Sequence, residues 1–145
     1  MSHTPEFKFD ATRNGVHAAP FSLAGLRARA VVQDIAWCEL DLDGVTTKKK
    51  FLDYCARALK FPAGFGGNWD ALADSLEDLS WQPATGVVVH WRNGAAFAKH
   101  TDEHSAALEI FTAAARYWKQ RSRLFLVLVD EGGQGGQLLP ALPQQ

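Results

Sequence analysis

Three apolar runs along the chain predict strands. Residues 35–42 (IAWCELDL) alternate in part, residues 87–91 (VVVHW) form a β-branched run, and residues 124–129 (LFLVLV) are continuously apolar. Continuous apolar strands are typical of a parallel sheet, in which helices cover both faces. Helical segments separate the three runs, which favours an α/β fold built from crossover connections.

The first helix between these strands has clear start and stop signals. It is expected to begin near Thr46 or Thr47, either of which can cap it, and it places Phe51, Cys55 and Leu59 on one face. It must end by Phe61, because Pro62 disfavours helical geometry in the residue before it. The three lysines at 48–50 are expected to be a solvated first turn, although cations are unfavourable at that end of the helix dipole.

Further segments are assigned by the same periodicity. Helices are predicted over residues 68–79, 95–99 and 102–120, with Thr101 as the cap of the last one. Nearer the N-terminus, residues 15–20 (GVHAAP) indicate a short extended segment and residues 22–30 a helix. The chain is expected to comprise an N-terminal extension over 1–33, one domain over 34–130, and a Gly-, Gln- and Pro-rich flexible tail over 131–145.

The helix predicted over residues 68–79 is amphipathic, and its polar face is purely acidic. Asn68 is a good N-cap, because its side-chain oxygen can accept a hydrogen bond from a backbone N–H of the first turn. At 100° per residue, the apolar positions fall on one side and the carboxylates on the other. The apolar side carries Trp69, Leu72, Leu76 and Leu79, and the acidic side carries Asp70, Asp74, Glu77 and Asp78.

This acidic face costs local stability. Asp70 and Asp74, and Asp74 and Asp78, are like-charge pairs at i,i+4, and each such pair costs about 0.2–0.5 kcal/mol. Only Asp70 lies in the first turn, where the helix dipole favours a negative charge. The nearest bases along the chain are Lys60 and Arg92. A segment that breaks local rules in this way is often a functional site.

An acidic helix face can serve three uses in a protein. Calcium sites take alternating oxygen ligands from a loop and not from a helical ladder. Acid–base catalysis needs a carboxylate with a raised pKa in an apolar pocket, which nothing in the sequence indicates. The third use, a negative surface presented to a strongly basic partner, fits the pattern, since local fields steer association and confer specificity.

Composition narrows the class of protein. The chain has 145 residues, 47% of them hydrophobic, and a formal net charge of −1, which suits one globular domain and excludes a generally basic nucleic-acid binder. No apolar run is long enough to span a membrane, and the N-terminus lacks a signal-peptide pattern, so a cytoplasmic location is expected. No cofactor is expected, and direct RNA binding and membrane binding are disfavoured.

The sequence disfavours a metal site and a redox function. Cys38 and Cys55 lie in apolar patterns and are expected to be a reduced, buried pair. Residues 100–104 (HTDEH) match the H-x-x-E-H pattern of one class of zinc peptidases, but the segment fits a helix N-terminus better. No metal site is therefore expected. His90, at the end of a buried strand, is expected to be structural.

The residues around the acidic helix carry a family resemblance. The succession FP, FG, NWDAL and DSLEDL over residues 61–79 resembles the barstar family, the intracellular inhibitors of barnase-type ribonucleases. The strands and helices over about 34–130 also match that family's pattern. The resemblance implies a single α/β domain with a three-stranded parallel sheet and helices packed around it.

The resemblance also implies a function without an enzymatic activity. The loop and acidic helix would block the active site of a basic ribonuclease, with Asp74 at the position of the central inhibitory carboxylate and Asp70 at that of the acidic residue one turn earlier. The predicted partner-binding residues are Phe65, Gly66, Gly67, Asn68, Asp70, Ala73, Asp74, Glu77 and Asp78.

The chain departs from the family pattern at three positions. Gly64 and Ala73 stand where archetypal barstar has aromatic side chains, and Ala113 stands where it has a further acidic contact. Aromatic residues are frequent interface anchors, so their loss bears on which ribonuclease is the target. The alternative left open is a barstar-fold interaction module that binds a basic partner without nuclease activity.

Overall fold

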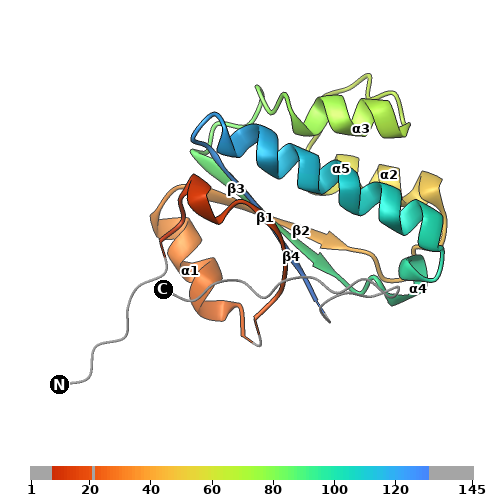
Figure 1. Cartoon of the computed structure of the whole chain (residues 1–145), viewed down its shortest axis with the longest axis horizontal. Helices are drawn as coiled ribbons and strands as arrows, with labels where there is room; N and C mark the ends of the chain where they lie inside the picture. The colour runs from red at the N-terminus through yellow and green to blue at the C-terminus, as the bar shows by residue number, and fades with distance from the viewer. Residues whose placement is uncertain (1–7, 21, 131–145) are drawn as a thin grey trace.

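The computed structural model describes residues 8–20 and 22–130, and its centre is a four-stranded parallel sheet (Figure 1). The strands are β1 (Gly15–Ala18), β2 (Ile35–Asp41), β3 (Gly86–Arg92) and β4 (Leu124–Val129). Their order in the sheet is β1-β4-β3-β2, and every neighbouring pair is parallel. The α/β class and the parallel sheet predicted from the sequence are confirmed.

The predicted number of strands is wrong, because β1 adds a fourth. The sequence indicated an extended segment at residues 15–20 but did not place it in the sheet. The segment pairs along β4, from Gly15 beside Leu126 to Ala18 beside Val129. In this strand only Val16 is buried, so β1 lacks the apolar run that marked the other three strands.

Helices cover the sheet on both faces. They are α1 (Ala24–Val32), α2 (Lys48–Ala58), α3 (Trp69–Leu76), α4 (Ala95–Ala98) and α5 (Thr101–Lys119). Figure 1 shows α2, α3 and α5 on one face of the sheet and α1 on the other. A short 3-10 helix, η1 (Ala11–Arg13), precedes β1.

The alternation of strand side chains creates two cores. Phe125, Val127 and Val129 of β4 belong to the larger core under α2, α3 and α5. Leu126 and Leu128 belong to the smaller core under α1. Burial on both sides explains why β4 is apolar at all six positions.

Most observed helix boundaries lie within one to three residues of the predicted ones, and α1 (Ala24–Val32) begins and ends two residues later than the predicted 22–30. Thr47 caps α2 as expected, with its Oγ1 accepting from the Lys50 N–H at 3.2 Å. Thr101 is not a cap, because α5 already includes it and its flanking residue, His100, makes no side-chain capping bond. Helix α3 ends at Leu76, three residues early, because Leu79 adopts a left-handed conformation with φ of 49°.

The division of the chain into an extension over 1–33, a domain over 34–130 and a tail over 131–145 stays a prediction. The predicted flexible tail lies outside the described residues. Within the described part of the chain, none of the helices has the length and apolar character needed to cross a membrane.

Candidate functional site: an acidic helix and the loop before it

The start of α3 is fixed by its first residues. Asn68 has an extended backbone, and its Oδ1 accepts a hydrogen bond from the Ala71 N–H at 2.7 Å, which confirms it as the N-cap. Trp69 follows and packs on Phe51 of α2, with ring centroids 6.0 Å apart. A capped first turn that is also packed against the core gives the helix a defined direction.

The apolar side of α3 fixes the helix against the core. Leu72 and Leu76 are fully buried, and Leu79, just beyond the helix, is nearly so. The Trp118 indole of α5 donates from Nε1 to the Leu76 carbonyl oxygen at 2.7 Å, which satisfies an acceptor that the helix end leaves free. The predicted apolar stripe is therefore confirmed, with Trp69 only half-buried at its edge.

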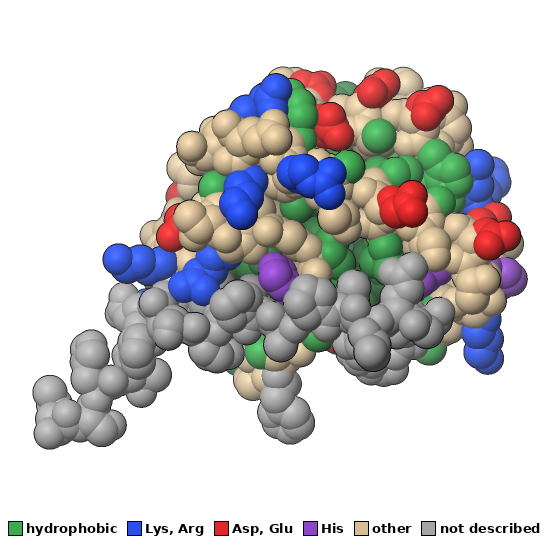
Figure 2. Space-filling view, viewed as in Figure 1, with side chains coloured by type: hydrophobic (Ala, Val, Ile, Leu, Met, Phe, Trp, Pro, Cys, Tyr) green, Lys and Arg blue, Asp and Glu red, His purple; other side chains and the backbone are tan. Residues whose placement is uncertain are grey.

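The carboxylates lie on the opposite side, in solvent. Asp70, Asp74 and Asp78 are exposed, and Glu77 is half-buried. Because α3 ends at Leu76, Glu77 is its C-cap and Asp78 follows the helix, so only Asp70 and Asp74 form a like-charge pair inside it. Figure 2 shows acidic side chains gathered along the upper edge of the molecule, over α3.

These four carboxylates are not neutralised within the described residues. Some carboxylates elsewhere have ion-pair partners, such as Asp53 with Lys49 at 3.1 Å and Glu39 with Arg92 at 3.2 Å. Among residues 8–20 and 22–130, neither an ion pair nor a side-chain hydrogen bond engages the acidic groups of Asp70, Asp74, Glu77 or Asp78. The surface is thus both negative and open to an external partner.

The loop before α3 contains glycines with specific backbone roles. Gly64 and Gly67 have φ values of +97° and +68°, which disfavour any side chain. A Cβ at Gly66 would lie 3.2 Å from the Cβ of Ala71, a tight contact. At position 64, where the family archetype has an aromatic residue, this loop thus has a conformation that favours glycine.

The rest of the loop and the neighbouring helix complete the surface. Phe65 is half-buried and packs against Phe61, with ring centroids 5.0 Å apart, so it attaches the loop to the core. Ala73 is half-buried on α3, and Ala113 is half-buried on α5, which packs against α3. With small side chains at 64, 73 and 113, the surface offers carboxylates and backbone, and few large apolar groups.

A second polar cluster lies at the carboxyl ends of the strands, and the sequence indicated only its histidine. His90 lies between two carboxylates, with Nδ1 2.7 Å from Glu39 Oε2 and Nε2 2.9 Å from Asp130 Oδ1. Burial by itself would raise the pKa of Glu39, but hydrogen bonds from Trp37 and His90 outweigh it and lower that pKa. These groups satisfy one another, which supports the structural role predicted for His90.

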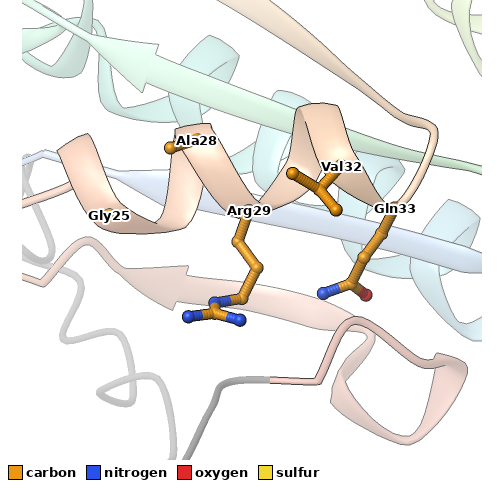
Figure 3. A pocket seen from close by; sticks show the side chains of 5 residues that line it. All are labelled: Gly25, Ala28, Arg29, Val32 and Gln33. Atoms are coloured by element: carbon orange, nitrogen blue, oxygen red, sulfur yellow. The ribbon is translucent and has the colours of Figure 1, made fainter.

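A shallow hollow runs along α1, on the opposite face of the sheet from α3. In Figure 3, Arg29 and Gln33 extend from the same side of this helix. The residues that line the hollow are Gly25, Ala28, Arg29, Val32 and Gln33. It contains no carboxylate, histidine or cysteine, so it supplies none of the side chains that the sequence singled out.

The two histidines of the H-x-x-E-H motif have different surroundings. His100 is exposed beside the start of α5, whereas His104 is only 2% exposed and lies edge-on to Trp91 and Phe97. Across the part of the chain that the structure describes, no three His, Cys, Asp or Glu side chains come together to hold a metal ion.

Both cysteines are buried and reduced, as expected. Burial raises the pKa of the Cys38 thiol to about 11 and that of the Cys55 thiol well above its usual value. Both are therefore thiols at neutral pH, which is the unreactive form.

Comparison with known proteins identifies a family. The model of the family described as "Barstar (barnase inhibitor)" matches residues 35–130, which include every strand except β1, the acidic helix and the loop before it. No curated protein matches the chain.

Proposed function

This chain belongs to the barstar family of barnase inhibitors, and on that premise we propose that it inhibits a basic ribonuclease by placing α3 and the loop before it in the nuclease active site. The family's members are inhibitors and not enzymes, and we propose no catalytic role for this chain. The partner-binding residues of the proposal are those predicted from the sequence, with Asp74 as the principal one.

One observation supports this proposal above the others. Asp70 and Asp74 on the outer side of α3, and Asp78 just beyond its end, are exposed, and none of them has an ion-pair partner in the described part of the chain. Carboxylates that lack internal partners lose little when an external cation binds them, because no existing ion pair has to break.

The chemistry of inhibition follows from the target's substrate. A ribonuclease binds RNA phosphates with cationic side chains, and a carboxylate held at a phosphate position can accept charge-assisted, often bidentate hydrogen bonds from those groups. Because the cap at Asn68 and the Trp118 bond to the end of α3 fix the helix, little conformational entropy is lost on binding. RNA is excluded by occupancy, and the inhibitor is not consumed.

We propose that this activity is exerted in the cytoplasm. An inhibitor that protects RNA has to meet the nuclease in the compartment where the RNA is, and the two free cysteines are compatible with a reducing compartment.

A titration tests the proposal. The protein is added to each member of a panel of barnase-type ribonucleases, and cleavage of a fluorogenic RNA is followed. Stoichiometric inhibition of at least one member is expected, and Asp74→Ala should weaken it about a hundredfold or more, since central charged groups are frequent hot spots. Asp43→Ala, which removes another exposed carboxylate from the loop after β2, is the matched control and should change little.

Two results would oppose the proposal. One is the absence of inhibition across the panel. The other is inhibition that Asp74→Ala leaves at the strength of the unmodified protein. Capture of a basic partner without nuclease activity would favour the interaction-module alternative.

A further inference from the structure

The first turn of α2, like the acidic side of α3, carries like charges that oppose the stability of its own helix, and here the charges are positive. Its first three residues are Lys48, Lys49 and Lys50, it has no acidic residue in the first turn, and it therefore places cations at the positive end of the helix dipole. The sequence alone indicated a solvated turn. The structure shows that this turn adjoins the start of α3.

The three lysines have different surroundings. Lys49 pairs with Asp53 one turn later, at 3.1 Å, which is an ordinary i,i+4 ion pair. Lys50 is exposed. Lys48 is half-buried, and its Nζ lies 5.2 Å from the centroid of the Trp69 ring, within the range of a cation–π contact.

The contact with Trp69 brings Lys48 to the proposed site. Trp69 is the first residue of α3 and directly precedes Asp70 in the chain. In the described residues, neither Lys48 nor Lys50 has an ion pair with a carboxylate. Figure 2 shows basic side chains at the right margin, beside the acidic edge and over the start of α2.

We propose that Lys48 is a specificity-determining residue of the docking surface, and that it pairs with an acidic side chain at the rim of the partner's cationic site. This inference rests on the proposed function and adds to it the charge pattern of the partner: positive opposite Asp70 and Asp74, and negative opposite Lys48. Basic ribonucleases without an acidic group at that position would be bound less well.

The geometry supports this role for Lys48 and excludes Lys50 from it. At 100° per residue, Lys48 and Lys50 differ by about 200° around α2, so they point to opposite sides of the helix. Lys48 points to the side that packs against Trp69 and α3. A ring beneath the ammonium group also limits its motion, so the charge is presented at a defined place.

Charge reversal at the two positions gives opposite predictions. Lys48→Glu and Lys50→Glu change the net charge equally, and on long-range grounds alone both should speed association with a basic nuclease. If Lys48 pairs with an acidic rim, Lys48→Glu places two carboxylates together and should raise the Kd about tenfold or more, because like charges at an interface are costly. Lys50→Glu should leave the Kd unchanged or lower it.

Loss of folding does not explain the expected effect. A glutamate at position 48 interacts favourably with the dipole of α2, and one at position 50 also forms a capping box with Thr47. Both variants should therefore be at least as stable as the unmodified protein, which thermal unfolding checks. Lys48→Arg keeps the charge and can stack on Trp69, so it should bind within about threefold of the unmodified protein.

The measurement is the Kd for the panel ribonuclease that the unmodified protein inhibits most tightly, with Asp74→Ala determined alongside. Weaker binding by Lys48→Glu, with Lys50→Glu and Lys48→Arg near the unmodified value, supports the inference. Equal or tighter binding by Lys48→Glu overturns it, and the proposed function still stands if Asp74→Ala weakens binding. If no panel member is inhibited, the proposed function and this inference are both overturned.

Discussion

At the scale of single residues, the carboxylates of α3 and the imidazole of His104 have opposite surroundings. Those on α3 are exposed and have no ion-pair partner among the described residues, as Asp74 shows. His104, in contrast, is buried among aromatic rings, and its Nε2 has no hydrogen-bond partner in the part of the chain that the structure describes. Burial lowers the pKa of His104, because the charged imidazolium would lose its hydration without gaining a counter-charge.

The lowered pKa of His104 predicts acid sensitivity of the fold. Neutral His104 makes its full contribution to the free energy of unfolding at pH values above its unfolded pKa of about 6.5. This contribution is lost as the pH falls from there towards the lower pKa of the folded state. The free energy of unfolding, measured with urea between pH 7.5 and pH 5, should therefore fall less in His104→Leu than in the unmodified protein. His100→Leu, at an exposed position four residues earlier, is the control and should follow the unmodified profile. Parallel profiles for His104→Leu and the unmodified protein would contradict this.

At the scale of elements, α3 combines firm attachment with an unfavourable charge arrangement. Its buried side carries Leu72 and Leu76, and Trp118 satisfies the carbonyl at its end. Its C-terminal end, where a cation would be favourable, carries Glu77 and Asp78. The element thus keeps charges that oppose its own stability, which is expected where binding and stability compete.

Reversing one of these charges should separate stability from inhibition. Asp78→Lys places a cation near the C-terminal end of α3 and should stabilise the protein by about 0.3–1 kcal/mol, because of the helix dipole. The same variant should weaken ribonuclease inhibition and slow association. Thermal unfolding and inhibition constants measure the two effects. Asp43→Lys changes the net charge equally, away from α3, and should affect inhibition less. An Asp78→Lys variant that inhibits better than the unmodified protein would argue against the orientation of the docking surface.

The sequence predicted best the elements that have a continuous apolar run or a regular apolar stripe. The errors lie where the local backbone conformation determines where an element ends. The continuous apolar run over residues 124–129 predicted β4, and the apolar stripe together with Asn68 predicted α3. The early end of α3 depends on the left-handed backbone at Leu79, a conformation that leucine rarely adopts and that no pattern signals. For the candidate site, the exposure of the carboxylates followed from helical geometry, whereas the contact between Lys48 and Trp69 required knowledge of how α2 packs beside α3.

At the scale of the whole molecule, the N-terminal segment is joined to the sheet by one side chain in particular. Asn14 donates from Nδ2 to the carbonyl oxygens of Ala115 and Arg123, at 3.1 and 2.8 Å, and its Oδ1 accepts from the Phe125 N–H at 2.8 Å. A single side chain therefore connects the start of β1 with α5 and β4. The sequence could not indicate this role, because the partners are backbone groups more than 100 residues away.

Removing this connection should destabilise the whole domain. Asn14→Ala loses three hydrogen bonds and leaves partly buried backbone groups unpaired, which should lower the free energy of unfolding by roughly 2–4 kcal/mol. Inhibition measured at a temperature where the variant is folded should be unchanged, since the hydrogen bonds of Asn14 are to Ala115, Arg123 and Phe125 and not to α3. Thr12→Ala, in the neighbouring η1, is the control and should cost less, because among the described residues the Thr12 hydroxyl bonds only Asp10. Equal costs for the two variants would show that Asn14 does not hold β1 in place.

The central claim is that the carboxylates of α3 occupy the phosphate-binding site of a ribonuclease, and competition tests it most directly. The apparent Kd of the protein for an inhibited ribonuclease is measured at constant ionic strength with increasing concentrations of a nucleoside 3′-monophosphate, which binds that site. Mutually exclusive binding predicts an apparent Kd that rises linearly with nucleotide concentration. An apparent Kd that stays constant while the nucleotide saturates the nuclease would contradict the account.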